Sequence, residues 1–244
     1  MRKYRFFSQQ SMQVGKQVLL DESLAHYITR VLRLNVGEVI YLFNNTGIEF
    51  CAQITQANKN RLNAVISAAE SSHTESPLDL HLALALIKFD KIDLILQKSC
   101  ELGVSRISLI ATQYTSIKNA YQRALEKAEH WQKILESAAA QCGRSSIPEL
   151  QIVPKLEEFF TQTDHASLKI ILDPRAINKA QLTHPQQAIT ILIGPEGGFS
   201  DPEVELASLQ NFSAMNLGPR ILRTETACFC ALTILQAEYG DLLC

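Results

Sequence analysis

The sequence predicts an α/β protein in which a small β-rich domain precedes a larger domain with a parallel sheet covered by helices. Residues 1 to about 70 hold short β-prone runs separated by turn residues. After Pro77, short apolar runs alternate with amphipathic helical segments, which is typical of a parallel sheet with helices on its faces. The segment 69–77 between these regions is small and polar and ends in proline, as domain linkers often do. We therefore expect one domain over 1–70 and a second over 71–244.

Three β-prone runs stand out in the first domain, over 38–43, 48–54 and 62–66. The first two are separated by the cluster Asn-Asn-Thr-Gly at 44–47. Because Asn and Gly tolerate positive φ, this cluster indicates a hairpin turn. The pattern favours a compact β-barrel-like domain.

The second domain contains five predicted strands and several predicted helices. The strands are expected over 80–87, 107–111, 169–172, 189–193 and 214–217. The clearest helices are expected over 91–102, about 121–142 and about 225–239, and Gly103, Gly143 and Gly240 follow them where helices commonly end.

Composition and charge exclude several classes of protein. The chain is 46% hydrophobic and 20% charged, as ordinary globular proteins are. No export signal is recognisable, and the longest apolar run, over 80–87, is too short to cross a bilayer. The six cysteines form no Cys-x-x-Cys pair, so we expect a cytoplasmic protein without a metal site. The formal net charge of −2 means that any contact with nucleic acid must depend on local basic patches.

The first segment that carries chemistry follows the predicted strand 189–193. Gly-Pro-Glu-Gly-Gly-Phe-Ser at 194–200 begins where that strand ends, and ligands of open α/β sheets bind outside the carboxyl ends of strands. Ser200 and Glu203 have the spacing of a capping box that opens the next helix. A plain strand-to-helix turn is an equally good interpretation of this segment alone. The segment has neither the Gly-Lys-Ser/Thr ending of a phosphate loop nor the spacing of a dinucleotide fingerprint.

The second segment lies between the predicted strand 214–217 and the last helix. Its two arginines, Arg220 and Arg223, stand at a helix start, where a cation opposes the helix dipole. We therefore expect them to face an anionic partner. Thr224 and Thr226 fit a binding site and a simple helix cap equally well.

The third segment ends the helix predicted over 121–142 with Gln-Cys-Gly-Arg and a proline soon after. Arg144 could take part in a site. From these residues alone, however, a capped helix whose arginine complements the helix dipole is the simpler interpretation.

Together these motifs resemble the RsmE family of 16S rRNA uridine-N3 methyltransferases, and their order and spacing match that family. The likeness rests on Gln-Lys-x-x-Glu-Leu-Gly-Val at 97–104, Gln-Cys-Gly-Arg-x-x-x-Pro at 141–148, Gly-Pro-Glu-Gly-Gly-Phe-Ser at 194–200, Leu-Gly-x-Arg-Ile-Leu-Arg-Thr-Glu-Thr-Ala at 217–227, and His-Tyr-Ile-x-x-Val-Leu-Arg at 26–33 with Val-Gly-Glu at 36–38. Two departures are visible, because Phe89 replaces a glycine that is usual in the family and Ala140 replaces a common glutamate.

The resemblance implies a SPOUT fold, whose chain forms a deep C-terminal trefoil knot, behind a small PUA-like RNA-binding domain. It also implies S-adenosylmethionine as cofactor, 16S rRNA within the small ribosomal subunit as substrate, and a homodimer whose subunits share the active site. The cofactor-binding residues that it implies are Leu172, Asp173, Gly194, Pro195, Gly197, Gly198, Leu217, Gly218, Ile221, Leu222, Thr224 and Ala227.

Methylation of uridine N3 requires that the nitrogen be positioned opposite the leaving sulfur and that the imide proton be removed. Cations near the base would stabilise the anion that forms, and Arg144 and Arg223 are the candidates for this role or for holding a phosphate. Glu225 or Glu196 is a candidate proton acceptor. The candidates for RNA contacts are Arg2, Lys3, Arg5, Arg30, Arg33, Lys88 and Lys91, although each singly is more often a solvated charge.

Three alternatives stay open at this point. Cys228 and Cys230 next to the second segment could supply a thiol nucleophile, but N3 methylation needs no covalent activation of the ring, so buried packing is favoured. The chain could also be an RNA-binding protein without activity. Finally, it could be a SPOUT enzyme with another acceptor, such as a tRNA ribose or guanine N1.

Overall fold

The computed structural model describes residues 3–58, 61–162, 168–176 and 188–243, which divide into two compact units. The first unit comprises residues 1–75 together with 139–147, and the second comprises 76–138 and 148–244. The change at residues 75 and 76 falls inside the expected linker. The segment 139–147, which the sequence placed in the larger domain, clusters with the first unit instead.

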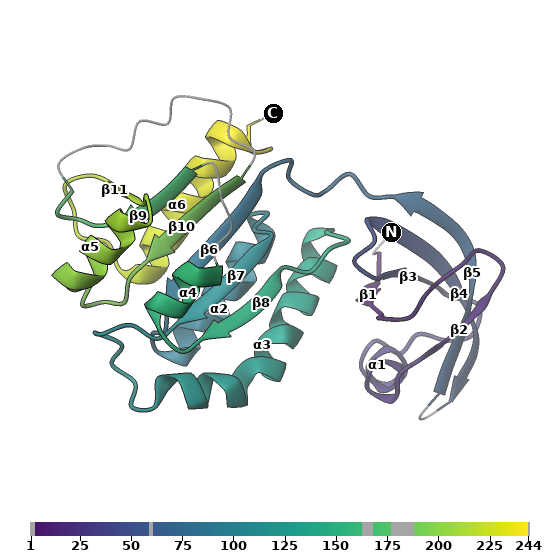
Figure 1. The fold of residues 1–244 in the computed structure, drawn as a ribbon. Coiled ribbons are helices and arrows are strands. Elements are labelled where there is room, and N and C mark those ends of the chain that lie inside the picture. Colours follow the sequence, from purple (N-terminus) through teal and green to yellow (C-terminus); the bar gives the residue numbers. More distant parts are fainter. Residues whose placement is uncertain (1–2, 59–60, 163–167, 177–187, 244) are drawn as a thin grey trace. The chain divides into compact units, whose positions relative to one another are not determined.

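The first unit is built on a five-stranded sheet (Figure 1). Its strands run in the order β1 (Arg5–Phe7), β3 (Val39–Phe43), β4 (Ile48–Asn58), β5 (Arg61–Ser71) and β2 (Gln17–Leu20). The pair β1–β3 is parallel, and the other neighbours are antiparallel. Two register shifts interrupt the long β4–β5 pair, and such irregularities bend a sheet.

The hairpin between β3 and β4 forms where the sequence predicted it. Asn45 and Gly47 have φ values of 62° and 73°, the left-handed conformation that favours these residue types. The edge strands β1 and β2 were not predicted, because three or four residues are too few to show an alternating pattern.

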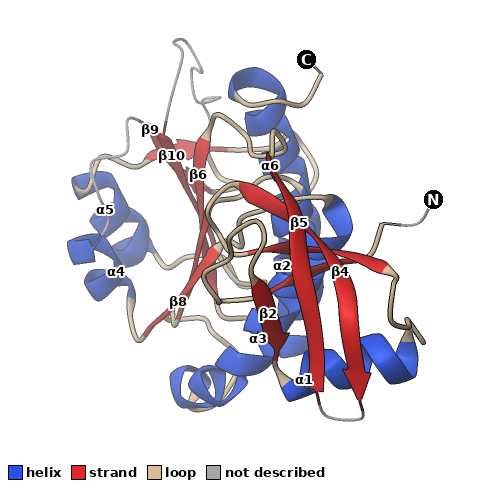
Figure 2. Ribbon diagram, turned by 90° about the vertical axis from the view of Figure 1, so that its right-hand side faces the viewer, coloured by secondary structure: helices blue, strands red, loops and turns tan. Residues whose placement is uncertain are grey.

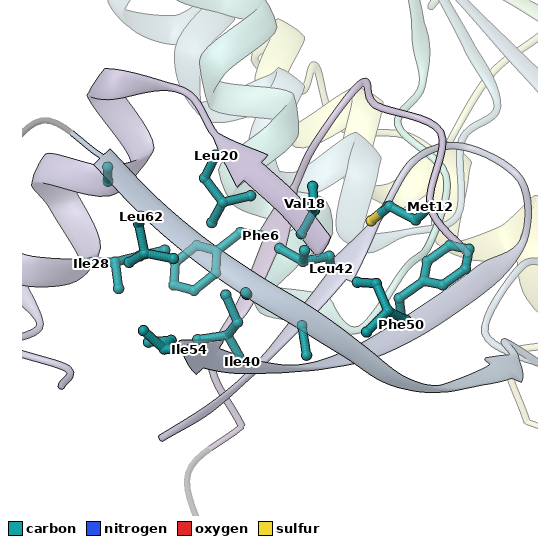
Figure 3. Packing of buried hydrophobic residues seen from close by; sticks show 14 of the residues in the cluster. Phe6, Met12, Val18, Leu20, Ile28, Ile40, Leu42, Phe50, Ile54 and Leu62 are labelled. Carbon is teal, nitrogen blue, oxygen red and sulfur yellow. The ribbon is translucent and has the colours of Figure 1, made fainter. Parts of the chain in front are cut away.

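The core of the first unit lies between the sheet and two short helical segments, α1 (Glu22–His26) and the π-helical turn η1 (Tyr27–Val31). The Asp21 carboxylate caps α1 by accepting a hydrogen bond from the Leu24 amide at 2.9 Å. Figure 3 shows apolar side chains from all five strands and η1 meeting in this core, among them Phe6, Val18, Leu20, Ile28, Ile40, Leu42, Phe50, Ile54 and Leu62.

The second unit contains the predicted parallel sheet. Its six strands are β6 (Asp79–Ala85), β7 (Arg106–Ile110), β8 (Glu149–Val153), β9 (Leu168–Leu172), β10 (Ala188–Ile193) and β11 (Ser213–Met215). They lie in the order β11-β9-β10-β6-β7-β8, and every neighbouring pair is parallel. The α/β class is therefore confirmed. The strand β8 was not predicted.

Helices cover both faces of this sheet (Figure 2). They are α2 (Phe89–Glu101), α3 (Ala120–Cys142), α4 (Leu156–Gln162), α5 (Asp201–Leu209) and α6 (Thr224–Tyr239). On one face, α4 and α5 pack on strand residues such as Ile171 and Leu192. On the other face α2 packs against α6 and α3, and the Phe89 ring meets Trp131 edge-on at 5.3 Å. Phe89 thus fills the contact between α2 and α3. Within the described part of the chain, no helix is both long and apolar enough to cross a membrane.

The predicted helix ends agree with the structure. Gly103 follows α2 with φ 75°, and Gly143 follows α3 with φ 94°. A side chain at Gly103 would also strike Gln236 of α6, whose amide donates to the Leu102 carbonyl at 2.9 Å. At the start of α5, the Glu203 carboxylate accepts from the Ser200 amide at 2.9 Å, which completes the predicted capping box.

A buried histidine makes the stability of the second unit depend on pH. His81 lies in β6, with Nε2 at 2.9 Å from Ser108 Oγ. Burial, assisted by the Arg106 charge, lowers the pKa of His81 from 6.5 to about 4. Between these values the unfolded chain binds the extra proton, so stability is lost as the pH falls below about 6.5.

From pH 7 to pH 5 we expect this histidine to cost about 2 kcal/mol of unfolding free energy. Urea denaturation of the unmodified chain and of His81→Gln at both pH values measures this contribution. The variant should lose less stability on acidification. Equal losses would show that His81 is not responsible.

Candidate functional site

A pocket opens at the carboxyl ends of β9, β10 and β11, where the chain leaves the sheet of the second unit. It holds about 660 Å³ of empty space, part of it open to solvent. Its walls are Leu172, Asp173, Pro174, Ile193, Gly194, Pro195, Glu196, Gly198, Met215, Asn216, Leu217, Gly218, Arg220, Ile221, Leu222, Thr224 and Ala227.

The structure brings the predicted cofactor residues together around this pocket, with one exception. Gly197 does not line it, because this residue faces Tyr114, and an added Cβ would lie 3.2 Å from the Tyr114 Cβ. Ile193, Met215 and Asn216 also line the pocket, and they were not predicted from the sequence. Ile193 and Met215 are the last residues of their strands, and Asn216 is a polar residue directly after Met215. Their position at strand ends is the sequence feature that could have predicted them.

Two glycines give the pocket walls backbone conformations that other residues rarely adopt. Gly198 and Gly218 have φ values of 71° and 108°. At Gly194 the restriction is space, because an added Cβ would lie 3.1 Å from the Phe199 ring. Main-chain atoms therefore border the pocket directly at these positions. A site that binds its ligand through main-chain groups requires this.

Side chains fasten the walls to one another. The buried Thr224 hydroxyl donates to the Gly194 carbonyl at 3.4 Å. Thr224 is therefore not the helix cap, which is Arg223. On the other side of the pocket, Asp173 accepts hydrogen bonds from the Arg175 amide and guanidinium, and Arg175 also donates to Asp201 at 2.7 Å.

The two candidate proton acceptors share one lysine. Lys91 Nζ lies 3.1 Å from Glu196 Oε1 and 3.4 Å from Glu225 Oε2. Partial burial works to raise the pKa of Glu196, but a hydrogen bond within its own residue and the Lys91 ammonium outweigh it, so its pKa lies below the ordinary value. A lowered pKa makes Glu196 a weaker base. Lys91, predicted to contact RNA, is engaged by these carboxylates instead.

Arg220 and Arg223 are the two arginines of the segment between β11 and α6. Arg220 lines the pocket, and Arg223 stands at the N-cap of α6 without a side-chain capping hydrogen bond. Both are exposed, and neither has an acidic partner among the residues that the structure describes. An arginine at a helix N-terminus is unfavourable unless an anion faces it. Their arrangement fits the predicted anionic partner.

Sequence comparisons identify the family of the chain. The profile of the RNA methyltransferase domain matches residues 74–236, and that of the RNA methyltransferase PUA domain matches residues 20–67. Ribosomal RNA small subunit methyltransferase E from Buchnera aphidicola subsp. Schizaphis graminum is 35% identical over 98% of this chain and 97% of its own length. The chain belongs to the ribosomal RNA small subunit methyltransferase E family. The family resemblance found in the sequence is confirmed.

Solved structures of similar proteins agree with this family. A methyltransferase from Legionella pneumophila, solved with bound S-adenosylmethionine, is 37% identical with a TM-score of 0.93, covering 99% of this chain and all of the other. Ribosomal RNA small subunit methyltransferase E from Neisseria gonorrhoeae, also bound to S-adenosylmethionine, is 32% identical with a TM-score of 0.92 at the same coverage.

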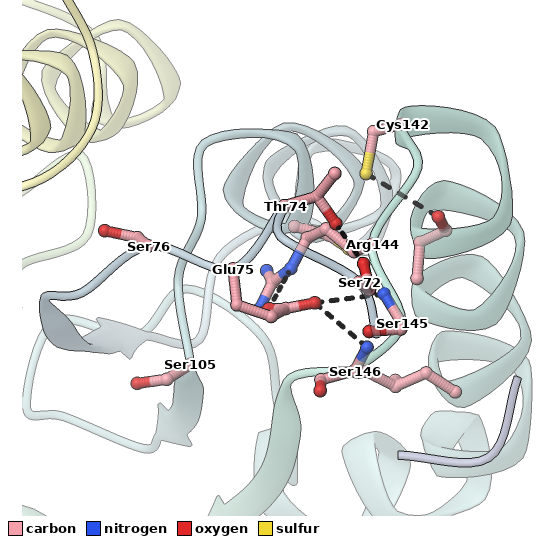
Figure 4. Close-up of polar contacts among 12 residues, drawn as sticks. Ser72, Thr74, Glu75, Ser76, Ser105, Cys142, Arg144, Ser145 and Ser146 are labelled. Carbon is pink, nitrogen blue, oxygen red and sulfur yellow. Dashed lines mark hydrogen bonds and ion pairs between the residues drawn. The ribbon is translucent and has the colours of Figure 1, made fainter. Parts of the chain in front are cut away.

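One family motif lies in the first unit and has a different environment from the one expected. Figure 4 shows Arg144 beside Glu75, which accepts from Arg144 Nε at 2.9 Å and Nη2 at 2.7 Å. The same carboxylate accepts from the Ser145 and Ser146 amides, both at 3.0 Å. Only 5% of Arg144 is exposed. The guanidinium is thus paired with Glu75 within the first unit.

Another predicted RNA contact, Arg5, is engaged inside the first unit. The Arg5 guanidinium donates to the carbonyls of Ala139, Ala140 and Arg144 at 2.9–3.1 Å and pairs with Glu49. Because these carbonyls lie at and just beyond the end of α3, Arg5 caps that helix. Ala140 contributes through its carbonyl, which any residue there would supply.

The remaining basic candidates differ in their freedom to bind RNA. Lys3 pairs with Glu49 and lies 4.2 Å from the centre of the Tyr41 ring. Arg30 and Arg33 are exposed on the first unit, and Lys88 is exposed at the start of α2. Arg2 lies outside the described residues.

The remaining candidate chemistry is a thiol or a metal. Cys228 is fully buried, and burial raises the pKa of its thiol, so this cysteine packs in the core rather than acting as a nucleophile. Among the residues whose placement is described, no three His, Cys, Asp or Glu side chains gather as a metal site would require.

Proposed function

We propose that this protein transfers a methyl group from S-adenosylmethionine to N3 of a uridine in 16S rRNA, in the cytoplasm and within the small ribosomal subunit. One observation carries the proposal. Apart from Gly197, the residues implied as cofactor-binding by the family motifs meet in one pocket of the second unit, and two full-length relatives are solved with S-adenosylmethionine.

The lining of the pocket suits this cofactor. Apolar side chains such as Ile193, Met215 and Leu222 offer a surface for adenine. Between β11 and α6, the amides of Leu217 and Ile221 find no acceptor among the described residues, so they are available to a ligand. The apolar surface suits the adenine ring, and the main-chain donors suit the polar atoms of adenine and ribose.

The bound cofactor would supply an electrophilic methyl group on a sulfonium. The chain must then hold the uridine in line and stabilise the anion that N3 becomes. We assign the second task to Arg223, with Arg220 as a second candidate, because neither guanidinium pairs with an acidic side chain among the described residues. Glu196 and Glu225 are less suitable as proton acceptors than the sequence suggested, because both carboxylates pair with Lys91.

The family resemblance supports three further proposals. We infer that the second unit has a trefoil knot. We infer that the first unit binds RNA, with Arg30 and Arg33 among its exposed cations. We also propose a homodimer, which sedimentation equilibrium would detect; a monomer at all working concentrations would contradict it.

The proposed activity is tested by incubating the protein and labelled S-adenosylmethionine with small ribosomal subunits or with deproteinised 16S rRNA. We expect label in the RNA. Comparison of the two substrates shows whether the protein methylates the assembled subunit or the free RNA. The Gly198→Val variant is the matched negative control, because valine is strained at φ 71° and would distort the pocket wall. No label with either substrate, from a protein that binds the cofactor, would favour an RNA-binding protein without activity.

A further inference from the structure

We propose that Lys91 is a positioning residue that holds two walls of the cofactor pocket together. The inference rests on the proposed function, because it concerns how that pocket is kept closed around S-adenosylmethionine. Lys91 stands in the first turn of α2 and does not itself line the pocket. Its effect on the cofactor is therefore indirect and passes through the two carboxylates that it binds.

The two carboxylates belong to different walls. Glu196 lies in the loop after β10 and lines the pocket directly. Glu225 lies in the first turn of α6, between the pocket residues Thr224 and Ala227. A single ammonium, at 3.1 Å and 3.4 Å from these carboxylates, thus joins the β10 loop, α6 and α2.

Glu225 depends on this lysine most strongly. Its side chain is 17% exposed, and its Oε2 atom is buried and accepts no hydrogen bond from any described residue. Lys91 is the only cation paired with it in the described part of the chain. A partly buried carboxylate without a partner is unfavourable, so loss of the lysine should displace the first turn of α6.

Mutual repulsion adds to this effect. Oxygens of Glu196 and Glu225 both lie within reach of the same nitrogen, so the carboxylates are close enough to repel one another when the ammonium is removed. The bond from Thr224 to the Gly194 carbonyl spans the same two walls, but at 3.4 Å it is long and carries no charge. Lys91 is therefore the stronger of the two connections.

The inference differs from the RNA contact that the sequence predicted for Lys91. A lysine that binds phosphate changes RNA affinity and its salt dependence, and leaves cofactor binding in the absence of RNA unchanged. A lysine that holds the pocket walls changes cofactor binding with no RNA present. Binding of S-adenosylmethionine to the protein alone separates the two roles.

The test compares Lys91→Met with Lys98→Met by isothermal titration with S-adenosylmethionine. Lys98 is a matched control, because it lies on the same helix and pairs with Glu101 at 2.8 Å, away from the pocket. We expect about ten-fold weaker affinity for Lys91→Met and unchanged affinity for Lys98→Met. Lys91→Arg should recover most of the affinity, since a guanidinium can donate to two carboxylates.

A second variant keeps the test decisive if Lys91→Met folds poorly. In the Lys91→Met background, Glu225→Gln removes the buried unpaired charge and should restore part of both the affinity and the thermal stability. Unchanged affinity in Lys91→Met, or an equal loss in Lys98→Met, would overturn the inference. Absence of binding by the unmodified protein would instead overturn the proposed function.

Discussion

The Arg144→Ala variant is expected to lose about 3 kcal/mol of stability in the first unit, because it leaves the Glu75 carboxylate without its counter-charge. Arg144 is 5% exposed and donates to Glu75 through two nitrogens. The Glu75 side chain retains 29% exposure, so water offsets part of the cost and the value falls at the low end for a broken buried pair.

Hydrogen–deuterium exchange followed by mass spectrometry measures this loss segment by segment. Exchange should accelerate in the peptide that holds Ser145 and Ser146, whose amides donate to Glu75. Arg144→Lys should recover only part of the protection, because lysine restores the charge without the two-pronged geometry. Cofactor affinity should stay unchanged. Unchanged protection together with lost methyl transfer would return Arg144 to a catalytic role.

The Arg223→Ala variant is expected to show the opposite behaviour. Its guanidinium is exposed and unpaired among the described residues, so its removal should leave stability unchanged and even relieve a cation at a helix N-terminus. Single-turnover methyl transfer at saturating RNA should fall by roughly ten-fold to a thousand-fold, if Arg223 stabilises the uridine anion. Arg223→Lys should rescue the rate partly.

A matched control for Arg223 is Lys127→Ala, which removes one exposed charge of the same sign from α3. If Arg223 holds a phosphate instead, the loss should appear as weaker RNA binding with a shallower salt dependence, and the saturated rate should be kept. Unmodified rate and RNA affinity in Arg223→Ala would remove this residue from the site.

The pocket was predictable from motifs that are local in the sequence and resemble those of the family. A polar residue or a glycine directly follows each of β9, β10 and β11, namely Asp173, Gly194 and Asn216. Parallel strands bring such ends to one edge of a sheet. Gly197 was the exception, because only the fold shows that this glycine faces Tyr114 rather than the pocket.

The environments of the basic residues were not predictable, because their partners are distant in the sequence. The end of α3 shows Arg144 as a plausible site residue, but Glu75 lies 69 positions earlier. Arg5 reaches carbonyls more than 130 positions away. Lys91 likewise meets Glu196 and Glu225 only through the fold. A single sequence gives the charge of a side chain and not the group that neutralises it.

The most direct test of the proposed function is the identity of the methylated nucleoside. RNA labelled by the protein with S-adenosylmethionine is digested to nucleosides, and mass spectrometry compares the product with a 3-methyluridine standard. We predict that the label appears in 3-methyluridine from 16S rRNA. Label in a 2′-O-methylated ribose, in 1-methylguanosine, or in tRNA rather than 16S rRNA would contradict the account.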